Sequence, residues 1–454
     1  MATRTVVSRT RRAEPAAIEL AFTREMFSAL SGNGSLAAGL RDYRSQAWEA
    51  YSSLGMPTTK DEPWRRTDLR GMPAGSFRLP DAQSSAMLEA PPDALLAPVV
   101  GDAQGGRVAL TAQGATSWLA PELAAQGVVF TDLLTAERQH PELMARMLGQ
   151  TVRTGEGKFA ALAGAGAWTG VVVYVPRNVI VEQPLQSLLW GPGAGLAYLS
   201  HVLVLLEEGA SLTYVHEAAS HTEAQGQSLH AGIVEIQVGQ GANLRFVELQ
   251  SWGEHVWNFS HERARVARDG QLDWIFGAIG SHLTKNFSEL ELVGEGASGR
   301  MSGFYFTDGV QHLDHDTQQN HLAPHTTSDL LFKGALKDKS RSVWQGMIYV
   351  ARDAQKTDGY QANRNLTLSP NARADSIPGL EILADDVRCT HGATVGKIDP
   401  ELVFYLRSRG LPYADAERLV VEGFFDPIMQ RIPFDGVRER FQKAILEKMG
   451  VKAL

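Results

Sequence analysis

The chain of 454 residues contains a single cysteine, Cys389, and this scarcity sets the first limits on its chemistry. One thiol excludes an internal disulfide framework and is typical of a protein from a reducing compartment. It also excludes a four-cysteine iron–sulfur site built from this chain alone. On residue type alone, a lone cysteine is most often a small buried hydrophobe.

Several other features that would indicate familiar functions are missing. No run of about 18 apolar residues occurs, so the sequence predicts no membrane span. The formal net charge of −8 argues against a general nucleic-acid surface. Neither the P-loop pattern nor the dinucleotide pattern is present at a suitable junction, so we expect that this chain does not hydrolyse ATP. The sequence also lacks a Gly-x-Ser-x-Gly nucleophile elbow.

The start of the chain, Met1–Arg12, is basic and contains no acidic residue. It lacks the apolar stretch of a secretory signal, so a solvated basic tail is the favoured interpretation and a transit peptide is the alternative. We therefore expect a cytoplasmic protein, with a plastid location only if the tail is a transit peptide.

Helical patterns occur at the two ends of the chain. Apolar residues at helical spacing over 16–54, broken at Gly32–Gly34, predict two N-terminal helices. Asp399 and Pro400 form a helix start, because Asp caps the first turn and Pro is favoured at its first position. We expect Leu402, Phe404, Tyr405 and Leu406 to pack in this helix and Gly410 to end it. Helices over 415–425 and 435–449 should follow, with Pro427 and Pro433 between them.

Strand patterns fill the middle of the chain. Candidates at Arg107–Thr111 and Val128–Phe130 precede a series of short β-branched or alternating segments that begins near Trp168. Turns between these segments carry glycines at positions 209, 241, 270 and 296, which are 32, 29 and 26 residues apart. A drifting period of this size without helices favours a solenoid of stacked strands over a β-sandwich. We divide the chain into a mainly helical region (1–155), a strand-built core (156–397) and a C-terminal helical region (398–454).

Cys389 and His391 are the main candidate site residues. Alternation in a strand places residues i and i+2 on one face, so the thiol and the imidazole would project side by side. This soft pair suits a transition metal. Gly392 and Gly396 would let the strand bend or another backbone approach closely. The alternative is a half-buried strand end with an ordinary thiol.

A second polar cluster lies between residues 312 and 325. Its four histidines and two aspartates are His312, Asp314, His315, Asp316, His321 and His325. These side chains could bind zinc or iron, but their spacing matches no recognised ligand pattern. Stacked polar residues also line β-helix turns, so we favour structural hydrogen bonding over metal binding.

Several strings of sequence resemble one known family. Asn371–Pro378, Cys389–Gly396 and Ile398–Gly410 together resemble the C-terminal signature of the SufB/SufD family, the β-helical components of the SUF iron–sulfur cluster assembly machine. Pro57–Leu69 resembles the N-terminal segment of the same family, and Phe159–Pro176 resembles its entry into the β-helix. The string Cys-Thr-His-Gly-Ala-Thr-Val-Gly is closer to the SufD version than to the SufB version.

This resemblance implies a right-handed parallel β-helix flanked by helices, in a scaffold subunit without enzymatic activity. It implies assembly with a SufB-like paralogue and a SufC-like ABC ATPase, while the isolated chain could form a homodimer. Iron or an iron–sulfur cluster would be held only transiently at the partner interface, and the assembled complex could carry a reduced flavin. His391 matches the SufD histidine that faces the SufB interface, with Cys389 beside it.

The resemblance also places the ATPase on the helices after Pro400. Phe424 and Phe425 stand at a helix end, where we predict contact with the ATPase or, alternatively, a role in the core. Two other functions stay open. A SufB-type primary scaffold would be expected to supply further functional cysteines. A polysaccharide-active β-helix enzyme could use Asp314 and Asp316, although such enzymes are typically exported.

Overall fold

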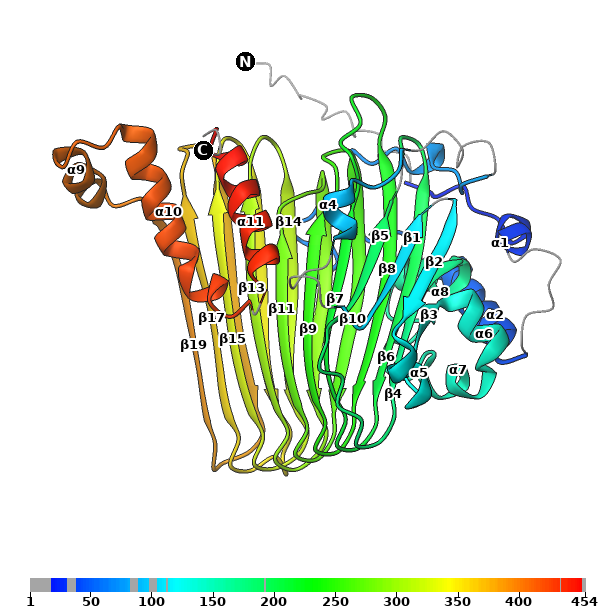
Figure 1. The fold of residues 1–454 in the computed structure, drawn as a ribbon. Helices are drawn as coiled ribbons and strands as arrows, with labels where there is room; N and C mark the ends of the chain where they lie inside the picture. The colour runs from blue at the N-terminus through cyan, green and yellow to red at the C-terminus, as the bar shows by residue number, and fades with distance from the viewer. Residues whose placement is uncertain are drawn as a thin grey trace, which may run out of the picture.

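Two long β-sheets form the body of the protein and face each other along its length (Figure 1). From β4 onward, successive strands go alternately to the two sheets, so each consecutive pair of strands makes one coil of a solenoid. The computed structural model describes residues 18–30, 38–81, 89–97, 104–111, 113–191, 193–432 and 434–450.

The two sheets contain ten and nine strands. The ten-stranded sheet consists of β2 (Gly114–Leu119), β1 (Gly106–Thr111), β5 (Leu185–Trp190), β7 (Ser211–Ala219), β9 (Asn243–Ser251), β11 (Gln271–Ala278), β13 (Ser298–Thr307), β15 (Thr327–Leu336), β17 (Asp358–Thr367) and β19 (Arg388–Lys397), in that spatial order. The nine-stranded sheet consists of β3 (Val129–Asp132), β4 (Thr169–Val175), β6 (Ala197–Leu206), β8 (Ser228–Val238), β10 (Val256–Val266), β12 (Leu283–Leu292), β14 (His312–His321), β16 (Arg341–Val350) and β18 (Arg373–Ile382).

Neighbouring strands pair in parallel and in continuous register through the solenoid. Residue 312 of β14, for example, lies opposite residue 341 of β16, and residue 321 lies opposite residue 350. Among the described strands, only the β1–β2 and β3–β4 pairs are antiparallel. The predicted parallel β-helix with flanking helices is therefore confirmed.

One row of tight turns joins the coils. Its residues all have positive φ: Asn178, Gly209, Gly241, Asp269, Gly296, His325 and Lys356. Successive turns are hydrogen-bonded to each other, as when the Gly209 amide donates to the Gln240 carbonyl at 2.9 Å and the Gly241 amide donates to the Arg268 carbonyl at 2.9 Å. The row includes three of the four predicted repeat glycines, but Asp269 occupies the place expected for Gly270. Asn and Asp tolerate this left-handed conformation better than most residues, so the repeat continues without a glycine at every turn.

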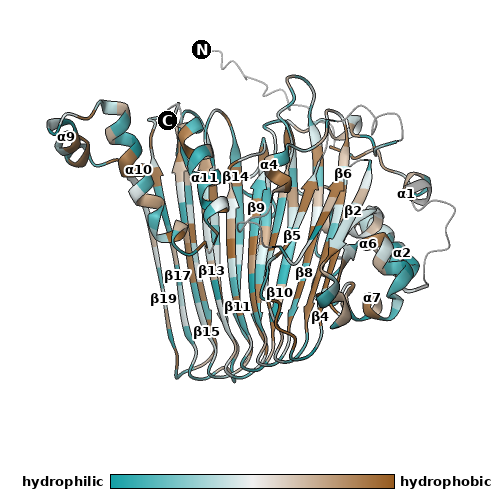
Figure 2. Ribbon diagram, viewed as in Figure 1, coloured by the Kyte–Doolittle hydropathy of each residue, from teal (hydrophilic) through white to brown (hydrophobic). Residues whose placement is uncertain are grey.

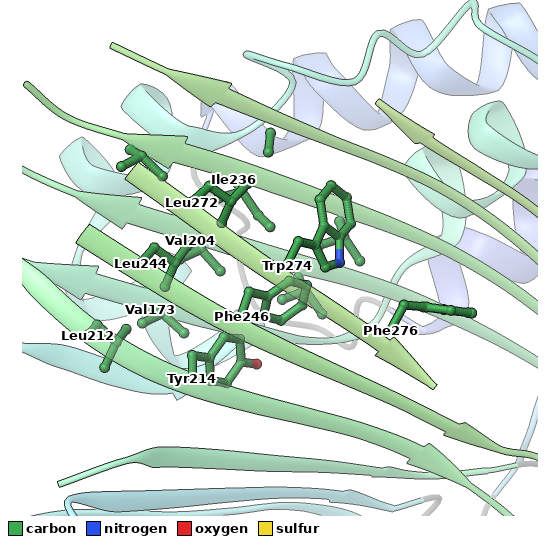
Figure 3. Packing of buried hydrophobic residues seen from close by; sticks show 14 of the residues in the cluster. Val173, Val204, Leu212, Tyr214, Ile236, Leu244, Phe246, Leu272, Trp274 and Phe276 are labelled. Carbon is green, nitrogen blue, oxygen red and sulfur yellow. The ribbon is translucent and has the colours of Figure 1, made fainter. Parts of the chain in front are cut away.

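Apolar side chains fill the space between the sheets, because alternate residues of each strand point inward. Figure 2 shows hydrophobic segments along the strands of both sheets. Tyr214, Phe246 and Trp274 stand in register on β7, β9 and β11, with ring centroids 5.5 Å and then 5.9 Å apart (Figure 3). The coils are therefore held together by side-chain ladders as well as by backbone hydrogen bonds.

Most N-terminal helices lie on the outer face of the nine-stranded sheet, whereas the short helix at residues 93–96 packs on the ten-stranded sheet. The helical elements of this region are α1 (Arg24–Leu30), α2 (Ala38–Ser53), η1 (Glu62–Trp64), η2 (Ala74–Ser76), α4 (Asp93–Leu96), α5 (Pro121–Ala125), α6 (Leu133–Gln139), α7 (Pro141–Met147) and α8 (Lys158–Gly166). Trp64 packs against Phe159, Phe259 and Phe287, with ring centroids 5.8–6.0 Å apart. This region also contains β1–β3, which extend both sheets; β1 and β3 lie where the two strand candidates at 107–111 and 128–130 were predicted. The expected break at Gly32–Gly34 lies outside the described residues.

The C-terminal region contains α9 (Pro400–Ser408), α10 (Tyr413–Met429) and α11 (Asp435–Lys448). Asp399 caps α9 by accepting a hydrogen bond from the Glu401 amide, as predicted. Helices α10 and α11 lie on the outer face of the ten-stranded sheet, while α9 projects away from it (Figure 1). Pro427 lies inside α10 rather than after it. Its neighbours Phe425 and Ile428 are buried against the sheet, and that packing holds the helix together through the proline. Pro433 lies outside the described residues.

The expected packing of α9 is wrong for three of its four residues, whereas the fourth, Leu406, is partly buried. Leu402, Phe404 and Tyr405 on α9 are 52%, 73% and 55% exposed, and Val403 is its buried apolar residue. Helical periodicity shows that one face is apolar, but it does not show which neighbour covers that face. No helix in the described part of the chain has the length and hydrophobicity needed to cross a membrane.

A buried carboxylate joins the N-terminal region to the solenoid. Glu235 on β8 is 1% exposed, and its oxygens accept hydrogen bonds from the amides of Gly149 (2.6 Å), Thr151 (2.7 Å) and Val152 (3.2 Å). The His201 imidazole lies 2.9 Å from the same carboxylate. Burial alone would raise the pKa of Glu235, but these hydrogen bonds outweigh it and hold the pKa below its usual value.

We predict that Glu235→Gln lowers the free energy of unfolding by roughly 2–4 kcal/mol, because an amide NH2 would face backbone N–H donors. Urea denaturation at neutral pH measures this difference, with the exposed Glu295→Gln as the matched control. The folded-state pKa is lowered, so the stabilisation is complete above the unfolded-state pKa of about 4.3 and is lost as the pH falls through the folded-state value. Equal stability of the two variants at neutral pH would contradict the anchor role.

Candidate functional site

Cys389 and His391 lie on the last strand of the ten-stranded sheet. Strand β19 pairs with β17 in parallel, which places Cys389 opposite Gly359 and His391 opposite Gln361. Gln361 is fully buried and its amide donates to the Gly379 carbonyl at 2.8 Å, so this face of β17 is the inward face. The thiol and the imidazole therefore share the inward face of β19, as the i, i+2 spacing predicted.

The two side chains have different environments. Cys389 is half-buried, whereas His391 is exposed because no further coil of the described chain covers it. A Cβ placed on Gly359 would lie 3.2 Å from the Cys389 sulfur, 3.3 Å from Ile348 and 3.4 Å from the His321 ring. The missing side chain at Gly359 thus lets these three groups converge. Burial raises the pKa of the Cys389 thiol, which keeps it protonated at neutral pH.

The end of the solenoid around β18 and β19 is open. Gly392 and Gly396 have nothing of this chain within 4 Å of an added Cβ, among the residues that the structure describes. Leu380, Ile382 and Val395 on these two strands are 36%, 38% and 50% exposed. An exposed apolar rim with an accessible imidazole is a surface on which a protein partner can bury area and contact a metal ion.

The polar cluster at residues 312–325 is divided by strand β14. Alternation turns His315 and His321 inward and turns Asp314 and Asp316 outward, while His325 is the turn residue of the stacked row. The inward His321 has hydroxyl partners, with its Nδ1 2.8 Å from Thr326 and its Nε2 2.8 Å from Ser328. In the described part of the chain, no three His, Cys, Asp or Glu side chains are arranged to hold a metal ion.

The outward half of this cluster lies under the N-terminal segment. Lys285 and Asp314 are fully buried, with Nζ 3.0 Å from the Asp314 carboxylate, and the Thr67 hydroxyl donates a short hydrogen bond to the same group. His312 also contacts the Thr67 hydroxyl at 2.9 Å. Burial raises the pKa of Asp316 to about 6, partly offset by the nearby Lys285 ammonium. These contacts fasten the segment around Thr67 to the sheet.

A buried acid pair lies inside the solenoid, and sequence reasoning missed it. Burial raises the pKa of both Glu248 on β9 and Glu262 on β10, and the two carboxyls are hydrogen-bonded to each other. They line an enclosed cavity of about 30 Å³ together with His216 and His230, whose pKa values burial lowers to about 3 and about 4. Burial thus favours the uncharged form of both carboxyls, and the two histidines are neutral at neutral pH. Counting every second residue of each strand would have placed Glu248 and Glu262 inward.

The two phenylalanines that we predicted at the ATPase interface are not equivalent. Phe425 is 1% exposed and packs against Phe304 and Phe306 of the sheet, so it belongs to the core. Phe424 is partly buried beside it, with the Lys333 ammonium 4.8 Å from its ring centroid. Neither ring has the exposure of Phe404 on α9.

The protein is an open-ended parallel solenoid whose last strand carries a cysteine and a histidine on its inward face. This arrangement defines a structural class rather than a reaction. Sequence comparison adds the family. The model described as the SufBD core domain of the SUF system for FeS cluster assembly matches residues 190–424, and that described as the SufBD protein N-terminal region matches residues 32–187. The chain belongs to the SufBD family of iron–sulfur cluster assembly proteins.

Curated relatives agree with this assignment. They include proteins named as iron–sulfur cluster assembly SufBD family members from Staphylococcus saprophyticus, Staphylococcus epidermidis and Staphylococcus aureus. Each is 31% identical over 314 residues, which covers 69% of this chain and 67% of the relative. These matches do not distinguish the SufB branch from the SufD branch.

We predict that the folded protein alkylates at Cys389 more slowly than an unfolded thiol at neutral pH, because the thiolate is the reactive form and burial raises the pKa. Iodoacetamide labelling across a pH series measures this directly, since the chain has no other cysteine. The urea-unfolded chain is the control. A folded-state midpoint at or below that of the unfolded chain would contradict the description of this site.

Proposed function

We propose that this protein is a SufD-type accessory subunit that contributes an iron ligand to a cluster-building interface. The observation that carries the proposal is the exposed His391 on the inward face of the terminal strand, at the open end of the solenoid. Neutral imidazole coordinates iron, and thiolate from a partner would complete the coordination. The iron or the growing cluster is the cargo of this interface.

The partner that fits this end is a SufB-like paralogue. Strands β18 and β19 end their sheets, and their outer backbone groups and half-exposed apolar side chains can continue into another solenoid. The single cysteine supports the SufD role over a primary scaffold, because this chain supplies one thiol and burial keeps that thiol protonated. The isolated chain then holds no stable cluster and does not hydrolyse ATP. A reduced flavin belongs to the assembled complex in this proposal.

The surface that best fits an ATPase partner is α9. Phe404, Tyr405 and Leu402 form an exposed apolar set on a helix that projects from the body of the protein. Aromatic side chains dominate binding energies when a partner buries them, and exposed apolar residues gathered on one short helix are typical of an interaction surface. This assignment replaces Phe425, which the core already buries.

We predict that His391→Ala leaves folding and complex formation intact and lowers cluster assembly about tenfold or more, since even loss of a residue that supports a metal ligand typically costs 10–100-fold. Cluster-dependent growth or enzyme maturation, in cells that rely on this system, measures the effect at matched protein levels. Thr390→Ala is the matched control, because its side chain is on the opposite face of the same strand. Cys389→Ser is expected to have a smaller effect.

Full activity of His391→Ala would remove the basis for the iron-ligand role. A variant that folds but fails to assemble with its partners would instead show that His391 holds the interface together.

We predict that Phe404→Ala weakens ATPase binding by about 2 kcal/mol, or roughly 30-fold in Kd, while the free energy of unfolding stays within about 0.5 kcal/mol. Calorimetric titration with the ATPase and urea denaturation measure the two quantities. Ile180→Ala removes a similarly exposed side chain from the solenoid and is the control for binding. Phe425→Ala should instead cost about 3–5 kcal/mol in stability. Unchanged affinity of a folded Phe404→Ala variant would rule out this surface.

A further inference from the structure

Glu248 and Glu262 meet across the space between the two sheets. Glu248 stands on β9 of the ten-stranded sheet and Glu262 on β10 of the nine-stranded sheet, and their carboxyls are hydrogen-bonded to each other. Both side chains are buried. An ionised carboxylate only accepts hydrogen bonds, so this contact requires a proton on at least one of the two carboxyls.

The hydrogen-bond donors around the two carboxyls differ, and the difference indicates which one carries the proton. Both oxygens of Glu262 have donors, since the Asn286 amide nitrogen lies 2.5 Å from Oε1 and the Ser288 hydroxyl lies 3.0 Å from Oε2. The donor that reaches Glu248 is the Trp274 indole N–H, 3.3 Å from Oε2. Donors favour the ionised form of the carboxyl that they contact. Glu262 is therefore the acceptor of the carboxyl–carboxyl hydrogen bond, and Glu248 is the donor.

The groups that face the pair supply no positive charge at neutral pH. In the described part of the chain, no lysine or arginine lines the cavity beside the pair. Its other titratable side chains are His216 of β7 and His230 of β8, which are neutral because burial lowers their pKa values to about 3 and about 4. The inward residues of β11 and β12 are uncharged, and burial lowers the pKa of His315 on β14 to about 3. Arg263, the next residue of β10, lies on the outer face and pairs with Glu156.

We propose that Glu248 and Glu262 form a proton-binding site inside the solenoid, which bonds the two sheets to each other while the proton is present. At neutral pH, the protonated carboxyl of Glu248 donates to the Glu262 carboxylate. Release of this proton to the solvent removes the bond and leaves two negative charges in contact. The pair lies in the middle of both sheets, away from β19, so this inference does not depend on the proposed SufD role.

The site gives folding a pH dependence of defined sign. Burial raises the folded-state pKa of both carboxyls above the unfolded-state value of about 4.3. The stabilisation from this site is therefore complete below the unfolded-state pKa and is lost as the pH rises through the folded-state pKa. Glu235 has the opposite dependence, because its folded-state pKa is lowered. Between the two pKa values of the site, its bound proton makes the unfolding constant rise by a further factor of about ten per pH unit.

Glu248→Gln in the full-length chain tests this site, because its amide NH2 can donate to Glu262 while its amide oxygen still accepts from Trp274. Urea denaturation between pH 5 and pH 7 gives the unfolding constants. Over this range, we expect the wild-type constant to rise about 100-fold more than that of the variant. The exposed Glu295→Gln is the matched control and should follow the wild type. The same pH dependence in the wild type and in Glu248→Gln overturns the proposal.

Glu262→Gln tests which carboxyl is the donor. An amide NH2 at this position would face the donors of Asn286 and Ser288, so we expect an unfolding constant at pH 5 about tenfold or more above that of Glu248→Gln. Equal constants, or the reverse order, contradict the assignment of the proton to Glu248.

Infrared spectroscopy of the folded protein detects the proton without the Glu248→Gln variant, because protonated carboxyls and carboxylates absorb at different frequencies. Exposed carboxyls are ionised at pH 7. Burial also raises the pKa values of Glu217 and Asp316, so the measurement uses the Glu217→Gln, Asp316→Asn chain. We expect the band of a protonated carboxyl at pH 7, and a folded chain without this band overturns the proposal.

Discussion

The parallel backbone ladder between successive coils is the constraint on which the rest of this structure depends. Each strand hydrogen-bonds to the equivalent strand one coil away, and the turn row from Asn178 to Lys356 repeats the same arrangement outside the sheets. Once the register of one coil is set, the inward and outward faces of every later strand follow from it. The aromatic ladder of Tyr214, Phe246 and Trp274 is a direct result, because in-register residues must stack on one another.

The candidate site inherits its geometry from this ladder. Cys389 and His391 face inward because Gly359 and Gln361 do, one strand earlier. What distinguishes them is the end of the ladder. The inward face that is buried in earlier coils becomes accessible at β19, since no described strand follows it. Inward-facing side chains are buried in the core when their strand lies in the middle of the solenoid, but they are exposed when their strand is the last one. The solenoid therefore supplies a site without any special loop.

Much of the fold and of the candidate site could be predicted from the sequence, because the strongest sequence signals are local. Period-2 alternation placed Cys389 beside His391, the Asp399–Pro400 pair marked the start of α9, and the turn glycines indicated stacked strands. The signals that failed depend on tertiary contacts. Asp269 takes the turn position expected for a glycine, because the stacked turns tolerate either residue. Whether Phe425 or Phe404 is buried depends on which helix lies against the sheet. The contact between Glu248 and Glu262 depends on the register across the coils, which the pattern of one strand alone does not reveal.

The arrangement of the C-terminal helices has a mechanical consequence. Helix α9 stands free of the solenoid, whereas α10 is packed on β13 and β15, close to the terminal strands β17 and β19. Only a short connection, residues 409–412, separates the projecting helix from the packed one. A load applied to α9 is thus passed to α10 and from there to the strands that α10 covers, β13 and β15. The helix that is free to meet a partner is therefore joined, through one packed helix, to the half of the solenoid that carries His391.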